Sequence, residues 1–149
     1  MTIQQDASTL LFLLSKDAFT SFLAALLLTL VIELLVAAAF LHFSRMGMRR
    51  KVLASAAVAN LLSLPVVWLI FPFLEGSYQY LNALLMAEAF AISFETLFIY
   101  FLNKDCLSLK KAFLLSAAMN VASVVAGFLI LLAAIFLPFN IPVFFPPGA

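Results

Sequence analysis

Residues 18–43 read AFTSFLAALLLTLVIELLVAAAFLHF, and this stretch decides the fold class. A helix that crosses a bilayer needs about 20 mostly apolar residues. The stretch is longer than that, and Glu33 is its one Asp, Glu, Lys or Arg residue. It is too long for the apolar part of a signal peptide, and no basic region precedes it, so we expect a retained membrane helix.

The composition of the whole chain agrees with this interpretation. Hydrophobic residues make up 66% of the 149 residues, whereas soluble domains average about 45–50%. Only 10% are charged, against about 25% in soluble domains. The mean hydropathy is +1.21. A soluble globular domain is therefore excluded, and the bilayer is the first expected partner.

Three further stretches satisfy the same length criterion: 52–74, 78–102 and 112–137. Short polar segments separate the four stretches, namely SRMGMRRK, EGS and NKDCLSLKK. The sequence predicts an all-α polytopic membrane protein with four transmembrane helices, which forms a single membrane domain over 1–149.

The basic residues predict the orientation. Four of the eight Lys and Arg residues lie in the first connection and three in the third. Short loops rich in Lys and Arg stay on the cytoplasmic side. We expect a prokaryotic cytoplasmic (inner) membrane protein with both basic loops in the cytoplasm and both termini outside.

The two halves of the chain resemble each other. TLVIELLVA (29–37) matches AISFETLFI (91–99), and SAAVANLLS (55–63) matches SAAMNVASV (116–124) one residue out of register. Each half thus has a Glu on its first helix and N-x-x-S on its second. This pattern predicts two tandem helical hairpins related by a pseudo-twofold axis along the membrane normal.

Helical rise places these polar side chains at a common depth. At 1.5 Å per residue, both glutamates and both asparagines lie roughly 10–15 Å below the cytoplasmic surface, and Glu88 lies roughly 10 Å further out on the same face as Glu95. The predicted intramembrane polar layer comprises Glu33, Asn60, Ser63, Glu88, Glu95, Asn120 and Ser123.

Two interpretations of this layer stay open. Ionisable residues inside a membrane usually mark a site for a proton, a cation or a polar headgroup. Alternatively, hydrogen bonds between Glu and Asn join the hairpins, each contributing about 1 kcal/mol. We favour joining for the Asn and Ser side chains. We favour function for the glutamates, because Ser or Asn would join helices at a lower desolvation cost.

The last residues, LPFNIPVFFPPGA (137–149), are uncharged and interrupted by prolines, so they cannot continue the helix. We expect this tail, 138–149, to dock at the outer interface or against another subunit. Its Phe139, Phe144 and Phe145 are the predicted contact residues.

Other function classes lack their residues. A single cysteine, Cys106, and a single histidine, His42, provide neither a redox pair nor a metal-ligand set. We find no constellation of catalytic residues and no basic aromatic surface. We therefore expect no enzyme, no metal site, no cofactor and no nucleic-acid partner.

The segments TLVIELLVA, NLLSLP, AEAFAISFETL and SAAMNVAS resemble a group of small four-helix prokaryotic membrane proteins. The resemblance spans about 29–127; it implies the fold and carries no activity. Two functions are expected to compete. One is a non-catalytic subunit or assembly component of a larger membrane complex, with other integral membrane subunits or a second copy as partner. The alternative is a small transporter or channel for protons or cations that uses the glutamates.

Overall fold

The computed structural model describes residues 16–44 and 49–136, and the chain is all-helical in this part. The four helices of these residues are α2 (Lys16–Phe43), α3 (Arg49–Ser77), α4 (Tyr80–Asn103) and α5 (Leu109–Phe136). Each is long and apolar enough to cross a membrane by length and composition.

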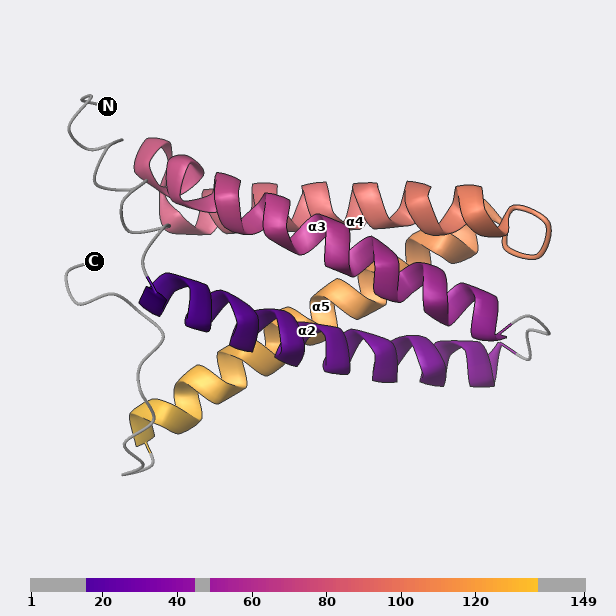
Figure 1. The fold of residues 1–149 in the computed structure, drawn as a ribbon, viewed down its shortest axis with the longest axis horizontal. Coiled ribbons are helices and arrows are strands. Elements are labelled where there is room, and N and C mark those ends of the chain that lie inside the picture. Colours follow the sequence, from indigo (N-terminus) through magenta and orange to yellow (C-terminus); the bar gives the residue numbers. More distant parts are fainter. Residues whose placement is uncertain (1–15, 45–48, 137–149) are drawn as a thin grey trace.

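The four helices form a ring around a shared interior (Figure 1). The main contacts join α2 to α3, α3 to α4, α4 to α5 and α5 to α2, while the two diagonal pairs contact weakly. Neighbouring helices run in opposite directions (Figure 1). Side chains from all four helices line one shared cavity.

Three helices, α2, α3 and α5, begin two or three residues before the predicted apolar stretches, whereas α4 begins two residues after its predicted start. The largest difference is at the connection between the second and third helices. Residues 75–77, which we expected to form the turn, are the last residues of α3, and the chain turns at Tyr78 and Gln79. The Tyr78 N–H donates to the Leu74 carbonyl at 2.8 Å, which extends the helical bonding past the polar residues.

The apolar packing is concentrated at one end of the bundle. We call this end, which holds Phe43, Arg49, Asn103 and Leu109, the narrow end, and the opposite end the wide end. The buried hydrophobic cluster lies between the glutamates and the narrow end, and consists of Ala37, Leu41, Val52, Ala56, Ala59, Ile99, Leu107, Ala112, Leu115 and Met119. Toward the wide end, the only buried hydrophobic residues in the described part are Ala83, Ala87 and Ala91.

In Figure 1 the helix ends cover a broader width at the wide end, where α2, α3 and α5 stand apart, than at the narrow end, where α2 lies next to α3 and α4 next to α5. Large side chains are fully buried at the narrow end, whereas at the wide end the fully buried hydrophobic residues are alanines. Larger side chains there, such as Phe22 and Trp68, whose rings contact each other, are half-buried. The interior is thus densely packed on the narrow-end side of the glutamates and less densely packed on the wide-end side.

Polar contacts brace the narrow end. Lys51 Nζ lies 3.1 Å from an Asp105 carboxylate oxygen and so ties α3 to the α4–α5 connection. The Asn103 amide donates to Ser55 Oγ at 2.6 Å, also joining α3 to α4. The pKa of the exposed Asp105 carboxyl is lowered, first by its own backbone N–H and then by Lys51.

The outward faces of the helices are apolar along their whole length. Leu27 and Leu81 near the wide end and Leu35 and Phe101 further along are each more than half exposed. A contiguous apolar surface of this extent is rare on proteins that live in water. It is the surface expected of helices surrounded by lipid chains.

Candidate functional site

The Glu33 carboxyl of α2 is held by side chains from two other helices. It accepts a hydrogen bond from Asn60 Nδ2 of α3 at 2.5 Å and one from Ser123 Oγ of α5 at 3.2 Å. Glu33 itself is only 2% exposed. One carboxyl group therefore joins three helices in the interior.

The Glu95 carboxyl of α4 has a matching environment and is 1% exposed. Ser63 Oγ of α3 donates to it at 2.9 Å, and Asn120 Nδ2 of α5 donates at 2.7 Å. A third donor, Ser116 Oγ of α5, lies 3.1 Å away. Glu95 thus joins α3, α4 and α5.

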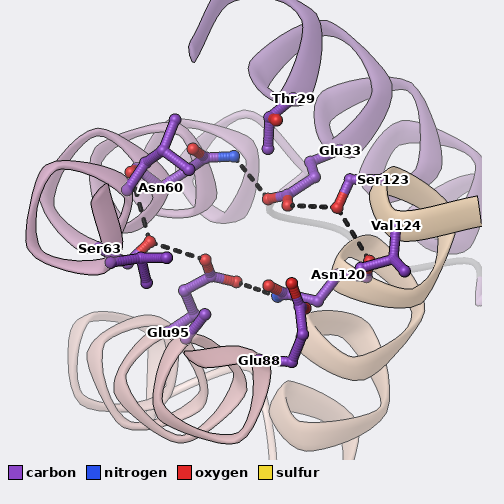
Figure 2. A pocket seen from close by; sticks show the side chains of 12 residues that line it. Thr29, Glu33, Asn60, Ser63, Glu88, Glu95, Asn120, Ser123 and Val124 are labelled. Atoms are coloured by element: carbon purple, nitrogen blue, oxygen red, sulfur yellow. Dashed lines mark hydrogen bonds between the residues drawn. The ribbon is translucent and has the colours of Figure 1, made fainter. Parts of the chain in front are cut away.

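The two sets of bonds are reciprocal. Each glutamate accepts from the asparagine of the helix that follows it in sequence: Asn60 for Glu33 and Asn120 for Glu95. Each also accepts from a serine of the helix that follows the other glutamate. The residues matched by the sequence repeat therefore occupy matching positions in the network (Figure 2).

Two positions break this correspondence. Ser116 stands four residues before Asn120, whereas Ala56 stands four residues before Asn60, so Glu95 has one more donor than Glu33. Glu88 stands one heptad before Glu95, and the position one heptad before Glu33 is Leu26. The third carboxyl is therefore present in one half only.

Glu88 differs from the other two glutamates in its surroundings. It is half-buried, and no described residue donates a hydrogen bond to it. Figure 2 shows its carboxyl turned toward the space between the helices, on the same helix as Glu95. It is the carboxyl whose oxygens are free to bind something that enters this space.

All three carboxyl side chains line one cavity of about 160 Å³. The remaining lining residues come from all four helices and are Thr29, Asn60, Ser63, Leu64, Val67, Ala91, Asn120, Ser123 and Val124. The apolar members lie on the wide-end side of the glutamates. No Lys, Arg or His is among these residues. A polar cavity of this size can hold several water molecules.

One buried acceptor in the cavity wall is unpaired. Asn60 is 2% exposed, and its Oδ1 has no hydrogen-bond partner in the described part of the chain. Buried polar atoms normally find a partner, and an exception needs an explanation.

The arrangement of the carboxyl groups does not favour a metal-binding site. Within residues 16–44 and 49–136, no group of three or more His, Cys, Asp or Glu side chains is placed so that it could hold a metal ion. The three carboxyls share a cavity without converging on one point.

The structure brings together all seven residues of the predicted polar layer, because all seven line this cavity. The predicted tail contacts, Phe139, Phe144 and Phe145, lie outside the described residues. Sequence reasoning missed Ser116 as a donor to Glu95, although its i, i+4 spacing to Asn120 places both side chains on one helix face.

Comparisons with known proteins add no relationship: no protein-family model matches the chain, and no curated protein or solved structure is significantly similar to it.

Proposed function

We propose that the chain is an integral membrane protein whose helices cross the bilayer as two tandem hairpins, α2–α3 and α4–α5. The helix lengths and the apolar outer faces support the membrane assignment. The reciprocal bonds of Glu33 and Glu95 support a pseudo-twofold axis along the membrane normal, which passes between the two glutamates.

In this proposal the narrow end faces the cytoplasm of a prokaryotic cell, and the wide end faces outward. The basic residues of the described part at the narrow end are Arg49, Arg50, Lys51, Lys104, Lys110 and Lys111. Basic residues in short connections remain on the cytoplasmic side of the inner membrane. Both termini then lie outside.

The proposed function is the binding and movement of a small cation, proton or other, across the membrane. One observation carries it: three carboxyl groups, Glu33, Glu88 and Glu95, line a single cavity with no basic side chain in its wall. An uncompensated carboxylate inside a bilayer costs several kcal/mol, about 2.5–3.5 on insertion scales. Three of them need a positive partner, and the cavity has room for it.

The test is a flux measurement on the purified full chain in liposomes. Wild type is expected to pass protons or a monovalent cation down an imposed gradient. Glu33→Gln or Glu95→Gln keeps the size of the side chain and removes the charge, and is expected to reduce the flux at least tenfold. The matched control is Glu75→Gln, because Glu75 is exposed and does not line the cavity.

Two outcomes of this test are decisive. Flux lost in the Glu33 and Glu95 variants but kept in the Glu75 variant supports transport through the cavity. An absence of flux in wild type for every cation tested, with protein shown to be inserted and monodisperse, contradicts it.

A second candidate is a non-catalytic subunit or assembly component of a membrane complex. The observation that favours it is that Glu33 and Glu95 already serve as bonds between helices, each joining three of them. The described connections, 78–79 and 104–108, are also short, so contacts with a partner would form largely within the bilayer.

Mild extraction from native membranes tests this candidate. Recovery with unlike chains at fixed stoichiometry supports a subunit, and the loss of those chains on truncation after Leu137 assigns the contact to the tail. Recovery as a homodimer alone, with wild-type flux in liposomes, contradicts it.

A further inference from the structure

We propose that the cation is the proton, and that Glu88 is the group that exchanges it between the cavity and the wide end. This inference rests on the proposed transport function. It identifies the transported ion and the end of the bundle at which the ion enters.

The serine hydroxyls show how the network can tolerate a proton that comes and goes. Ser63 Oγ lies 2.9 Å from Glu95 and 3.3 Å from the Asn60 carbonyl, and Ser123 Oγ lies 3.2 Å from Glu33 and 2.8 Å from the Asn120 carbonyl. A hydroxyl has one proton and two lone pairs, so it serves one of these acceptors at a time.

The two orientations of the serine hydroxyl match the ionised and the protonated forms of the carboxyl group. When Glu95 is ionised, Ser63 donates to it. When Glu95 carries a proton, the hydroxyl rotates toward its backbone carbonyl and accepts from the carboxyl. Ser116 has the same pair of acceptors, Glu95 Oε2 at 3.1 Å and the Ile92 carbonyl at 3.2 Å. The protonation state of Glu95 can therefore change without leaving a buried hydroxyl donor unpaired.

The Glu88 carboxyl favours a ligand that donates hydrogen bonds, because it lines the cavity and no described residue donates to it. A hydronium ion, or water that carries the proton between carboxyls, supplies such donors. A bare metal ion supplies none, and the described side chains form no cluster that could hold one.

Glu88 is the carboxyl best placed for exchange. It is half-buried, whereas Glu33 and Glu95 are almost fully buried. It also lies on the wide-end side of Glu95, where the fully buried hydrophobic residues are alanines and the larger side chains are only half-buried. Toward the narrow end, Leu41, Ile99, Leu115 and Met119 block the way from the glutamates. Protons therefore reach the pair through Glu88.

The exchange step conserves its atoms. The O–H bond of protonated Glu88 breaks, and its proton passes through cavity water to an oxygen of ionised Glu95. Glu88 is left as a carboxylate and takes a new proton from water at the wide end. The titratable groups that face the cavity are Glu33 from α2 and Glu88 and Glu95 from α4. The α3 and α5 residues in the wall, Asn60, Ser63, Asn120 and Ser123, do not titrate.

The experiment uses liposomes that contain a pH-sensitive dye and the full chain, with a potassium diffusion potential to drive protons. Wild type is expected to acidify the lumen. Glu88→Gln is expected to reduce the rate at least tenfold, and Glu88→Asp, which keeps a carboxyl, to recover part of it. Glu75→Gln, on an exposed glutamate outside the cavity, is expected to match wild type.

The outcomes separate this inference from the broader proposal. Unchanged proton flux in Glu88→Gln, with flux lost in Glu33→Gln and Glu95→Gln, overturns the role of Glu88 and leaves transport intact. Sodium or potassium flux without proton flux overturns only the identification of the proton as the transported ion. An absence of any flux in wild type removes both. Because no described residue donates a hydrogen bond to Glu88, its Gln variant is expected to fold, and gel filtration checks this.

A cysteine scan tests the port of entry separately. In a Cys106→Ser background, Glu88→Cys is expected to react with a membrane-impermeant thiol reagent added at the wide end. Leu115→Cys, in the packed cluster, is expected to stay unreactive from both sides. Labelling of the Glu88 variant only from the narrow-end side would overturn the proposed direction of access.

Discussion

Ser63 on α3 donates a hydrogen bond to the Glu95 carboxyl on α4, and Ser123 on α5 makes the equivalent bond to Glu33 on α2. These bonds connect residues far apart in the sequence, between one half of the repeat and the other. They make the association of the two halves depend on serines that look like ordinary small packing residues in the sequence.

Removal of one such serine is expected to weaken the bundle modestly. Ser63→Ala should lower the free energy of unfolding by about 1 kcal/mol, the usual size of a side-chain hydrogen bond between membrane helices. Chemical denaturation in mixed micelles measures it. In a double-mutant cycle with Glu95→Gln, the two losses should be less than additive, because both changes disturb one bond. Strict additivity would mean that the bond contributes nothing.

Removal of an asparagine is expected to be costlier. Asn60→Ala leaves the buried Glu33 with Ser123 as its one donor in the described part, and an unserved buried acceptor costs about 1–3 kcal/mol. Asn82→Ala is the control, because Asn82 is exposed on α4, and its effect should stay within about 0.5 kcal/mol. Equal effects of the two substitutions would argue against a structural role for the network.

Truncation at the narrow end is expected to create a cavity. Leu115 is fully buried in the apolar cluster, and Leu115→Ala should destabilise the protein by about 2–5 kcal/mol. Leu85→Ala, which changes a side chain on the outer face, should have a much smaller effect. Thermal unfolding followed by circular dichroism compares them. Similar midpoints for the two variants would contradict the uneven packing described above.

Acid is expected to weaken the Lys51–Asp105 ion pair. The pKa of Asp105 is lowered from 3.8 in the folded protein, so its contribution to stability is present above that value and is lost as the pH falls through the folded pKa. The contribution is small because both side chains are about half exposed. The difference in melting temperature between wild type and Asp105→Asn should therefore narrow below pH 4. A difference that stays constant down to pH 2 contradicts this.

The sequence predicted the coarse architecture because apolar length is a strong signal, and four stretches carried it. The all-helical fold with four helices long enough to cross a membrane is confirmed. The repeat also selected Glu33, Asn60, Glu95 and Asn120, whose side chains the structure brings to one cavity. The resemblance to small four-helix prokaryotic membrane proteins stays a prediction.

The sequence could not predict which side chains form hydrogen bonds across the bundle. Depth along a helix follows from counting residues, but which faces meet depends on helix rotation and packing. The counting placed Glu88 on the same face as Glu95, but it did not show that Glu88 lacks the hydrogen-bond donors that the other two glutamates have. The less dense packing at the wide end was equally hard to predict, because Ala83, Ala87 and Ala91 look like any close-packing stripe in the sequence.

The uneven filling of the interior also limits how the molecule can move. The buried cluster at the narrow end opposes separation of the helices there, whereas fewer side chains are fully buried at the wide end, so we expect the wide-end halves of the helices to separate at a lower cost. The proposed twofold axis along the membrane normal would exchange the two hairpins but not the two ends. A conformation that opens at the narrow end therefore cannot arise by exchanging the conformations of the two halves of the repeat. We expect the narrow end to open only when α2–α3 and α4–α5 pivot apart there, a movement that breaks the Asn103–Ser55 bond first.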